Sequence, residues 1–287
     1  LTGMGGGALM TPALIFLGVN PTAAVANDLV SASVSKSVGA AVHWREGSPN
    51  LKLALWLIVG SVPTAFAGGF IVAAVGGGEE QQDFVALAIG CALLFTSATY
   101  ALRMYLQLRH VTSGNELSQD DPVVRPIPTL LVGATGGLLV GITSVGSGSL
   151  IMVALLLLYP TLSAVKLVGT DLLQAVPLVL AAAVSHVLVG GVEWPVLIPL
   201  LLGSIPGTFL GARIANWVSQ SVIRRGIVIV LFLTGLKMLG TPPEIVGIVG
   251  AGMLLLGPLA WGFIRQTRGL PAFDNNAAAW RVPDRDK

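Results

Sequence analysis

Charged residues are scarce in this 287-residue chain, where Asp, Glu, Lys and Arg together make up 10% of the residues. An ordinary soluble domain has about 25%. Hydrophobic residues make up 54%, and the mean hydropathy is +0.82. A water-soluble fold cannot cover that much apolar surface with so few charges. The composition therefore excludes a soluble enzyme and a disordered protein, and it indicates an integral membrane protein.

Cysteine is almost absent, since Cys91 is the one cysteine in the chain. It excludes an intrachain disulfide and any metal site built from several cysteines. The formal net charge of +2 is small, and scattered basic residues do not favour a nucleic-acid partner. The sequence also lacks the short motifs of hydrolases, zinc proteases and nucleotide-binding loops. We therefore predict no enzymatic activity, no cofactor and no metal site.

The chain also lacks an initiator Met and a charged leader, and it opens directly on a glycine cluster. We expect an N-terminally incomplete chain. Long apolar runs fill most of the rest, and a helix needs about 20 such residues to cross a membrane. Their composition favours helices over a barrel, whose strands would alternate apolar and polar residues. The runs are 8–17, 21–42, 53–75, 84–105, 129–158, 163–187, 195–216, 222–239 and 245–264.

The sequence contains an internal repeat at a constant offset of 143 residues. Apolar helices share Leu and Ala by chance, but they do not share polar residues, Pro and Gly in register. The matched pairs that carry the repeat are Gly3/Gly146, Gly5/Gly148, Asp28/Asp171, His43/His186, Gly47/Gly190, Pro63/Pro206 and Gly68/Gly211.

The two copies are predicted to have opposite orientations in the membrane. Cytoplasmic loops carry an excess of Lys and Arg. The loop at 43–52 contains two basic residues, so it is expected inside, whereas its repeat partner at 187–195 contains none and is expected outside. This assignment leaves the run 129–158 without a full crossing. We therefore predict a re-entrant hairpin with its tip at Gly141–Gly148, and an equivalent tip at Gly3–Gly7.

Re-entrant hairpins in inverted repeats are typical of secondary transporters, which bind substrate near the membrane midplane. Glycine lets backbone N–H groups approach a ligand closely, and a helix N-terminus attracts an anion. The glycines could instead allow close helix packing. The polar residues that follow each tip are spaced four apart, as Asn27 with Ser31 and Thr170 with Gln174, so the two members of each pair share one face of a helix. The predicted substrate-binding residues are Gly3, Gly5, Gly6, Gly146, Gly148, Asn27, Ser31, Thr170 and Gln174.

Asp28 and Asp171 lie about two turns inside their helices, where a carboxylate is costly and is a functional candidate by default. Each could bind a coupling proton, cap a hairpin or pair with a base. Lys36 and Lys166 could reach the membrane surface or face a cavity. His186 is expected to form a hydrogen bond near a helix end rather than to bind a metal.

The segment GMGGGALMTPAL, the NDL triplet that follows it, and the second copy VGTDLLQAVPLVLAAAVSHVLVGG resemble the sulfite exporter TauE/SafE family of membrane transporters. The resemblance covers about residues 3–240. It implies a multi-pass transporter of the bacterial inner membrane that moves sulfite, an organosulfonate or another sulfur-containing anion without ATP. The run at 245–264 and the residues after it lie beyond the resemblance.

The predicted fold is an all-α membrane protein with two inverted repeats, re-entrant glycine-rich hairpins and about seven full spanning helices. The expected order is a first repeat, a cytoplasmic loop, a second repeat, an additional helix and a flexible cytoplasmic tail, at 1–108, 109–126, 127–240, 241–264 and 265–287. The expected partners are a small sulfur-containing anion, the lipid bilayer and a coupling proton.

Two other functions fit the same pattern. A carrier of a divalent metal ion or another small solute would use the two aspartates as ligands. A membrane scaffold subunit that does not transport would need no cavity, and its polar pairs would face other helices. Neither the direction of transport nor the oligomeric state follows from the sequence.

Overall fold

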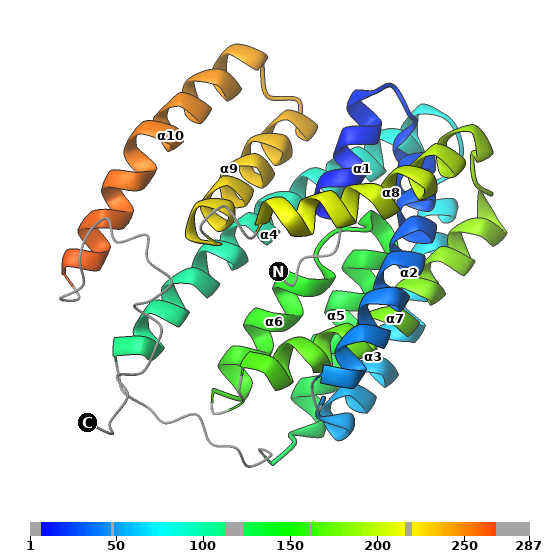
Figure 1. Ribbon diagram of the computed structural model, residues 1–287. Coiled ribbons are helices and arrows are strands. Elements are labelled where there is room, and N and C mark those ends of the chain that lie inside the picture. The colour runs from blue at the N-terminus through cyan, green and yellow to red at the C-terminus, as the bar shows by residue number, and fades with distance from the viewer. Residues whose placement is uncertain are drawn as a thin grey trace.

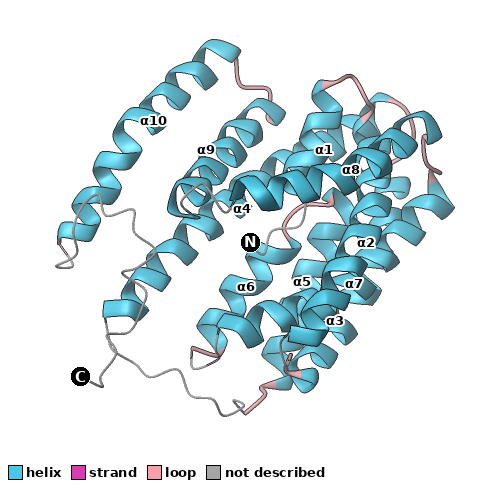
Figure 2. Cartoon of the chain, in the orientation of Figure 1, coloured by secondary structure: helices cyan, strands magenta, loops and turns pink. Residues whose placement is uncertain are grey.

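A computed structural model of the chain describes residues 7–46, 49–112, 123–160, 162, 164–215 and 220–267. Within these ranges every regular element is a helix (Figures 1 and 2). The helices are α1 (Gly7–Phe16), α2 (Pro21–Glu46), α3 (Leu51–Ala74), α4 (Glu79–Thr112), α5 (Pro126–Thr143), α6 (Ser147–Leu158), α7 (Ala164–Val189), α8 (Trp194–Ala215), α9 (Gln220–Met238) and α10 (Pro243–Gln266).

The prediction of an all-helical membrane protein is confirmed for the described residues, but seven full spans are not. Among the residues that the structure describes, five stretches are long and apolar enough to cross a membrane: Leu51–Ala74, Glu79–Tyr105, Pro126–Thr143, Lys166–Val189 and Pro243–Phe263. The predicted spans in α2 and α9 are more polar. Helix α2 includes Asn27, Asp28 and Lys36, and α9 includes two arginines and Lys237.

The helix bounds follow the sequence repeat. Helices α2 and α7 begin 143 residues apart and end 143 residues apart, and the starts of α3 and α8 have the same separation. Contacts between helices follow it too. Helix α3 packs on α7 while α8 packs on α2, and α4 packs on α6 while α9 packs on α1. The repeat is therefore visible both in the elements and in their packing.

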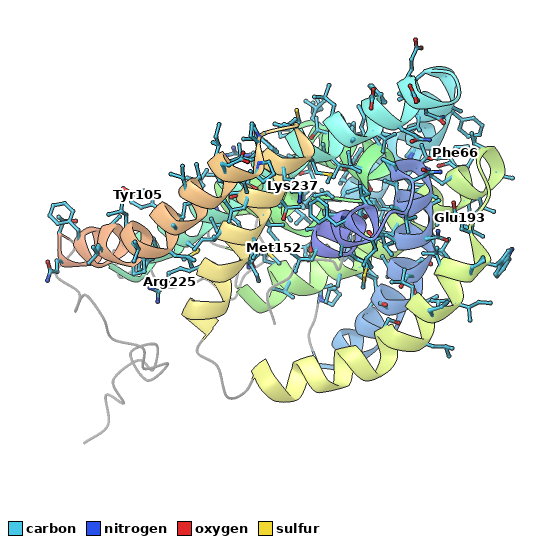
Figure 3. The ribbon with its side chains drawn as sticks, turned by 90° about the horizontal axis from the view of Figure 1, so that it is seen from above. Phe66, Tyr105, Met152, Glu193, Arg225 and Lys237 are labelled. Atoms are coloured by element: carbon cyan, nitrogen blue, oxygen red, sulfur yellow. The ribbon has the colours of Figure 1, made fainter. Side chains whose placement is uncertain are left out.

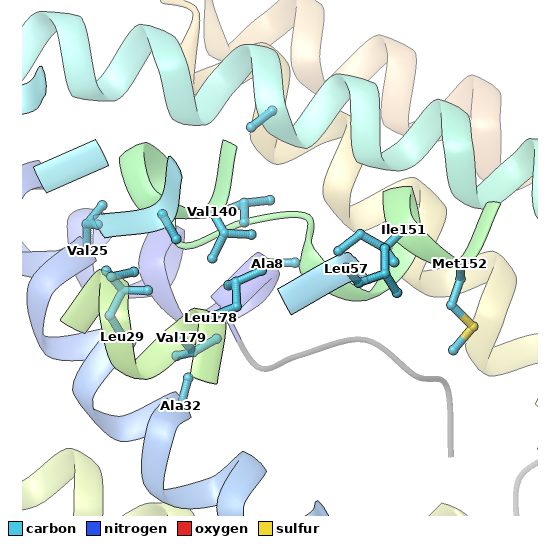
Figure 4. Close-up of a cluster of buried hydrophobic side chains, with 14 of the residues drawn as sticks. Ala8, Val25, Leu29, Ala32, Leu57, Val140, Ile151, Met152, Leu178 and Val179 are labelled. Carbon is cyan, nitrogen blue, oxygen red and sulfur yellow. The ribbon is translucent and has the colours of Figure 1, made fainter. Parts of the chain in front are cut away.

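The core of the molecule is a bundle in which α3, α5 and α7 lie side by side (Figure 1). Helix α10 lies at the outer edge, beyond α9. Buried side chains from several helices meet in one apolar cluster, including Leu29 of α2, Leu57 of α3, Ile151 of α6 and Leu178 of α7 (Figure 4). Large apolar side chains also cover the outside, as expected for a surface that faces lipid. Figure 3 shows how many side chains project outward from the bundle, among them Phe66 of α3.

Helices α3 and α5 make close backbone contact through small residues. Gly133, Gly137 and Gly141 are spaced four residues apart on α5, and they lie against Leu57, Ser61 and Ala65, which have the same spacing on α3. Small residues at this spacing let two helix backbones approach closely, which favours association in a membrane. The residue numbers increase together along the contact, so α3 and α5 run parallel.

Helix α7 runs parallel to α3 as well. The backbone N–H of Asn50, which caps α3, donates to the Thr170 hydroxyl at 3.0 Å. Further along, Ser61 donates to Gln174 at 3.4 Å, and Gly69 lies against Ser185. These three contacts fix the register of α3 on α7 over most of the length of both helices.

The α3–α5 contact predicts a strong effect of a single methyl group. Substitution Gly137→Ala places Cβ against the Ser61 backbone, where nothing can rotate away. We expect the thermal unfolding temperature in detergent to fall by several degrees, since overpacking costs about 1–3 kcal/mol. A Cβ added at Gly247 of α10 would meet no heavy atom within 4 Å, so Gly247→Ala serves as the control and should leave the unfolding temperature unchanged. Equal effects of the two substitutions would contradict this packing.

Candidate functional site

The apolar run 129–158 is interrupted at Ser144–Gly146, inside the glycine-rich stretch predicted as a hairpin tip. Helix α5 ends at Thr143 with Ser144 in the left-handed conformation, at a φ of 60°. Helix α6 then begins after Gly146, whose φ is 101°. Ser144 is the one non-glycine residue with a positive φ in the described part of the chain. Such a backbone conformation in a residue with a Cβ needs support from its surroundings.

The start of α5 and the end of α6, the two arms of this hairpin, lie next to each other. Tyr159 follows the last residue of α6, and its hydroxyl accepts a hydrogen bond of 2.8 Å from the backbone N–H of Arg125, before α5. The same hydroxyl lies 2.6 Å from the hydroxyl of Thr129. Tyr159 is buried. The chain therefore returns to its starting level after the turn at Ser144–Gly146.

Backbone groups at the tip have partners close by. The Ser144 N–H donates to the Val140 carbonyl at 2.7 Å, and the Val145 N–H donates to the Thr143 hydroxyl at 3.1 Å. Irregular backbone inside a membrane requires such partners because lipid offers none. Gly146 caps α6 without a side-chain hydrogen bond, and the first N–H groups of a helix have no partner inside the helix. The start of α6 therefore presents donors at the break.

Asp28 of α2 holds the break in place. One carboxylate oxygen accepts hydrogen bonds from the Ser144 hydroxyl at 2.6 Å and the Thr11 hydroxyl of α1 at 2.7 Å. All three side chains are buried. Hydrogen bonds to a charged acceptor are short and strong. The carboxylate thereby links the first repeat to the hairpin of the second.

Asp171 lies in a different polar network. Gln174 donates to its carboxylate at 3.3 Å, and Ser61 of α3 donates to Gln174 at 3.4 Å. Asp171 and Gln174 are both buried. Lys36, which is partly buried, interacts electrostatically with both Asp28 and Asp171.

The other predicted site residues have distinct surroundings. Asn27 is fully buried, and neither its amide nitrogen nor its amide oxygen has a hydrogen-bond partner. Ser31 and Gly148 are also buried. Thr170 is occupied by Asn50, as described above. Gly3, Gly5 and Gly6 lie outside the described residues, and so does the side chain of His43.

His186 is buried and forms a hydrogen bond with the backbone of a neighbouring helix. Its Nε2 donates to the Gly141 carbonyl of α5 at 2.7 Å. Among the described residues, no three His, Cys, Asp or Glu side chains gather closely enough to hold a metal ion. Ser144, Thr11 and Ser61 were missed by the sequence reasoning. A search for hydroxyl residues near the predicted tip would have found Ser144, but it would not have found the others.

Comparisons with known proteins agree with this architecture. Residues 1–238 match the family described as Sulfite exporter TauE/SafE. The chain belongs to this family. Helix α10 lies beyond the matched residues. The resemblance seen in the sequence is thus confirmed, and a membrane transporter agrees with both the family description and the apolar helices.

Two curated relatives come from Bacillus subtilis (strain 168). The "Probable membrane transporter protein YjnA" is 35% identical over 240 residues, which is 83% of this chain and 93% of that protein. The "Probable membrane transporter protein YdhB" is 27% identical over 220 residues, which is 75% of this chain and 84% of that protein. These names indicate membrane transport rather than enzymatic activity. No solved structure matches the chain.

The contacts of Asp28 predict a difference between two substitutions. Asp28→Asn keeps an oxygen that can accept from Ser144 and Thr11, whereas Asp28→Ala leaves both buried hydroxyls without their acceptor. We expect Asp28→Ala to lower the free energy of unfolding by about 1–3 kcal/mol more than Asp28→Asn, since each bond to a charged acceptor contributes about that much. Unfolding in mixed micelles measures the difference. Equal stability of the two variants would show that these bonds do not hold the break.

Proposed function

We propose that the chain is a secondary transporter that moves sulfite or a small organosulfonate across the bacterial inner membrane. The observation that carries the proposal is the interrupted helix at Ser144–Gly146, which presents the N-terminus of α6 beside buried polar residues. A helix N-terminus carries the equivalent of about half a positive charge and free N–H donors. The family description supports a sulfur-containing anion as substrate.

The proposed binding residues are those that the sequence predicted around the two tips. Gly146 and Gly148 supply backbone at the start of α6, while Asn27 supplies a buried amide that has no other partner. An unpaired buried amide is costly unless a ligand or water pairs with it. Ser31, Thr170 and Gln174 complete the polar surroundings on α2 and α7. Gly3, Gly5 and Gly6 are proposed to play the equivalent part at the first tip.

Proton coupling follows from the charges around the break. Asp28 lies against the tip through Ser144, so an anion bound at α6 and an ionised Asp28 would repel each other. Lys36 offsets part of this repulsion because it interacts with both aspartates. A proton bound at Asp28 removes more of it, because the interaction of charges is strong where water is excluded. Asp171, the repeat counterpart of Asp28, is proposed as a second carboxylate that can bind a proton. We therefore propose that a proton and the anion move together.

The aspartate part of the proposal is tested by Asp171→Asn. The amide keeps an oxygen that can accept from Gln174, so the protein should fold and should unfold near the wild-type temperature. We expect sulfite flux into proteoliposomes under an imposed pH gradient to fall at least tenfold. Asp83→Asn, which makes the same chemical change at an exposed position near the start of α4, is the control. Wild-type flux in Asp171→Asn would remove Asp171 from the mechanism.

We also infer that the two repeats have inverted orientations, as the charges of the loops predicted. The parallel register of α3 and α7 supports this inference. Asp28, near the start of α2, lies at the level of the α5–α6 break, and Gly141 beside that break contacts His186 near the end of α7. Helices α2 and α7 are repeat partners, and these contacts place the start of α2 at the same level as the end of α7. Two equivalent helices that run in opposite directions are what inverted repeats require.

Single cysteines test the orientation. In a Cys91→Ser background, Leu51→Cys and Glu193→Cys place thiols at exposed positions in equivalent loops of the two repeats. Inverted repeats predict that a membrane-impermeant thiol reagent labels Glu193→Cys in intact cells and labels Leu51→Cys only after permeabilisation. Labelling of both from the same side would mean that the repeats are parallel.

A further inference from the structure

Thr96 of α4 has a buried hydroxyl without a partner. Its side chain is 1% exposed, and Oγ1 has no hydrogen-bond partner among the residues that the structure describes. By contrast, the hydroxyl of Thr99, one turn further along the same helix, donates to the backbone carbonyl of Thr96 at 2.9 Å. Burying a hydroxyl without a hydrogen bond is unfavourable, and valine would fill the same volume without that cost. The position therefore carries a polar atom that packing does not require.

The unpaired hydroxyl lies beside the break in the hairpin. A Cβ built on Gly146 would come 3.4 Å from Oγ1 of Thr96. Gly146 is the residue before α6, it has a φ of 101°, and it caps the helix without a side-chain hydrogen bond. Helices α4 and α6 are in contact. The Thr96 hydroxyl is thus close to the start of α6, where the first N–H groups of a helix have no partner within the helix itself.

We propose that Thr96 is a substrate-binding residue whose hydroxyl donates a hydrogen bond to an oxyanion held at the N-terminus of α6. This inference rests on the proposed function and adds to it a donor from α4, a helix that supplies none of the residues predicted from the sequence. An anion with several oxygens on one sulfur atom can accept from the backbone N–H groups and from Thr96 together. The glycine at 146 leaves room for that approach, because a side chain there would meet both Thr96 and Leu139.

The test compares three variants in purified, reconstituted protein. Thr96→Val removes the hydroxyl at nearly constant volume, Thr96→Ser keeps it, and Thr99→Val makes the same change at a hydroxyl bonded within its own helix. We expect Thr96→Val to raise the KM for sulfite flux about tenfold or more, as for loss of a hydrogen bond to a charged group. Thr96→Ser and Thr99→Val should stay within about twofold of wild type.

Thermal unfolding without sulfite supplies a second readout, which separates binding from packing. Because the hydroxyl has no partner in the protein, Thr96→Val should unfold at the wild-type temperature or above it. Added sulfite should raise the unfolding temperature of wild type, and the rise should be smaller in Thr96→Val. A lower unfolding temperature for Thr96→Val without sulfite would overturn the proposal, because it would assign the hydroxyl a structural role.

The two hypotheses fail in different ways. If wild type transports sulfite and Thr96→Val has an unchanged KM, the role of Thr96 is wrong while the proposed function stands. If folded wild type neither transports sulfite or a small organosulfonate nor gains stability from either, both the proposed function and the role of Thr96 are overturned.

Discussion

The fold depends on which groups form hydrogen bonds with the backbone where a helix ends inside an apolar protein. Lipid supplies no hydrogen-bond partners, so a break such as Ser144–Gly146 is tolerated only when protein groups pair with it. The left-handed Ser144 is held by Asp28, which comes from the other repeat and also binds Thr11. A single carboxylate therefore joins α1, α2 and the hairpin.

Contacts between the repeats recur elsewhere in the bundle. Asn50 and Ser61 of the first repeat form hydrogen bonds with Thr170 and Gln174 of the second. The glycine contacts of α3 with α5 also join the two repeats. These contacts are close and specific, so α3, α5 and α7 are expected to move as a unit. In a transport cycle, motion would then fall on the helices packed around them.

Much of the framework was predictable because it rests on patterns that recur along the chain. The repeat offset predicted the matching bounds of α2 and α7, and the glycine-rich stretch Gly141–Gly148 predicted where the long apolar run breaks. The buried aspartates stood out because carboxylates are rare in apolar helices. The prediction of seven full spans is not confirmed, because length and composition identify five candidate spans among the described residues, and these do not include α2 or α9.

The partners of the aspartates could not be predicted in the same way. Thr11 and Ser144, which donate to Asp28, are ordinary hydroxyl residues in a sequence with many of them, and no spacing marks them. The same holds for Thr96, which binds neither aspartate. They matter because three helices converge at one point, and that convergence is a property of the packing. Hydroxyls can also bond within their own helix, as Thr99 does. The sequence could not show which of them would be left for another partner.

The central claim is that an oxyanion binds at the start of α6, and locating a heavy analogue of sulfite tests it most directly. Selenite has the same pyramidal shape and charge type, and selenium gives an anomalous X-ray signal. In crystals of the protein grown with selenite, we predict one anomalous peak, which marks the selenium atom, beside the start of α6. The selenite oxygens should lie about 3 Å from the backbone nitrogens at Gly146–Gly148 and from the Thr96 hydroxyl. A selenite peak bound elsewhere in the bundle, with the start of α6 empty, would contradict the account.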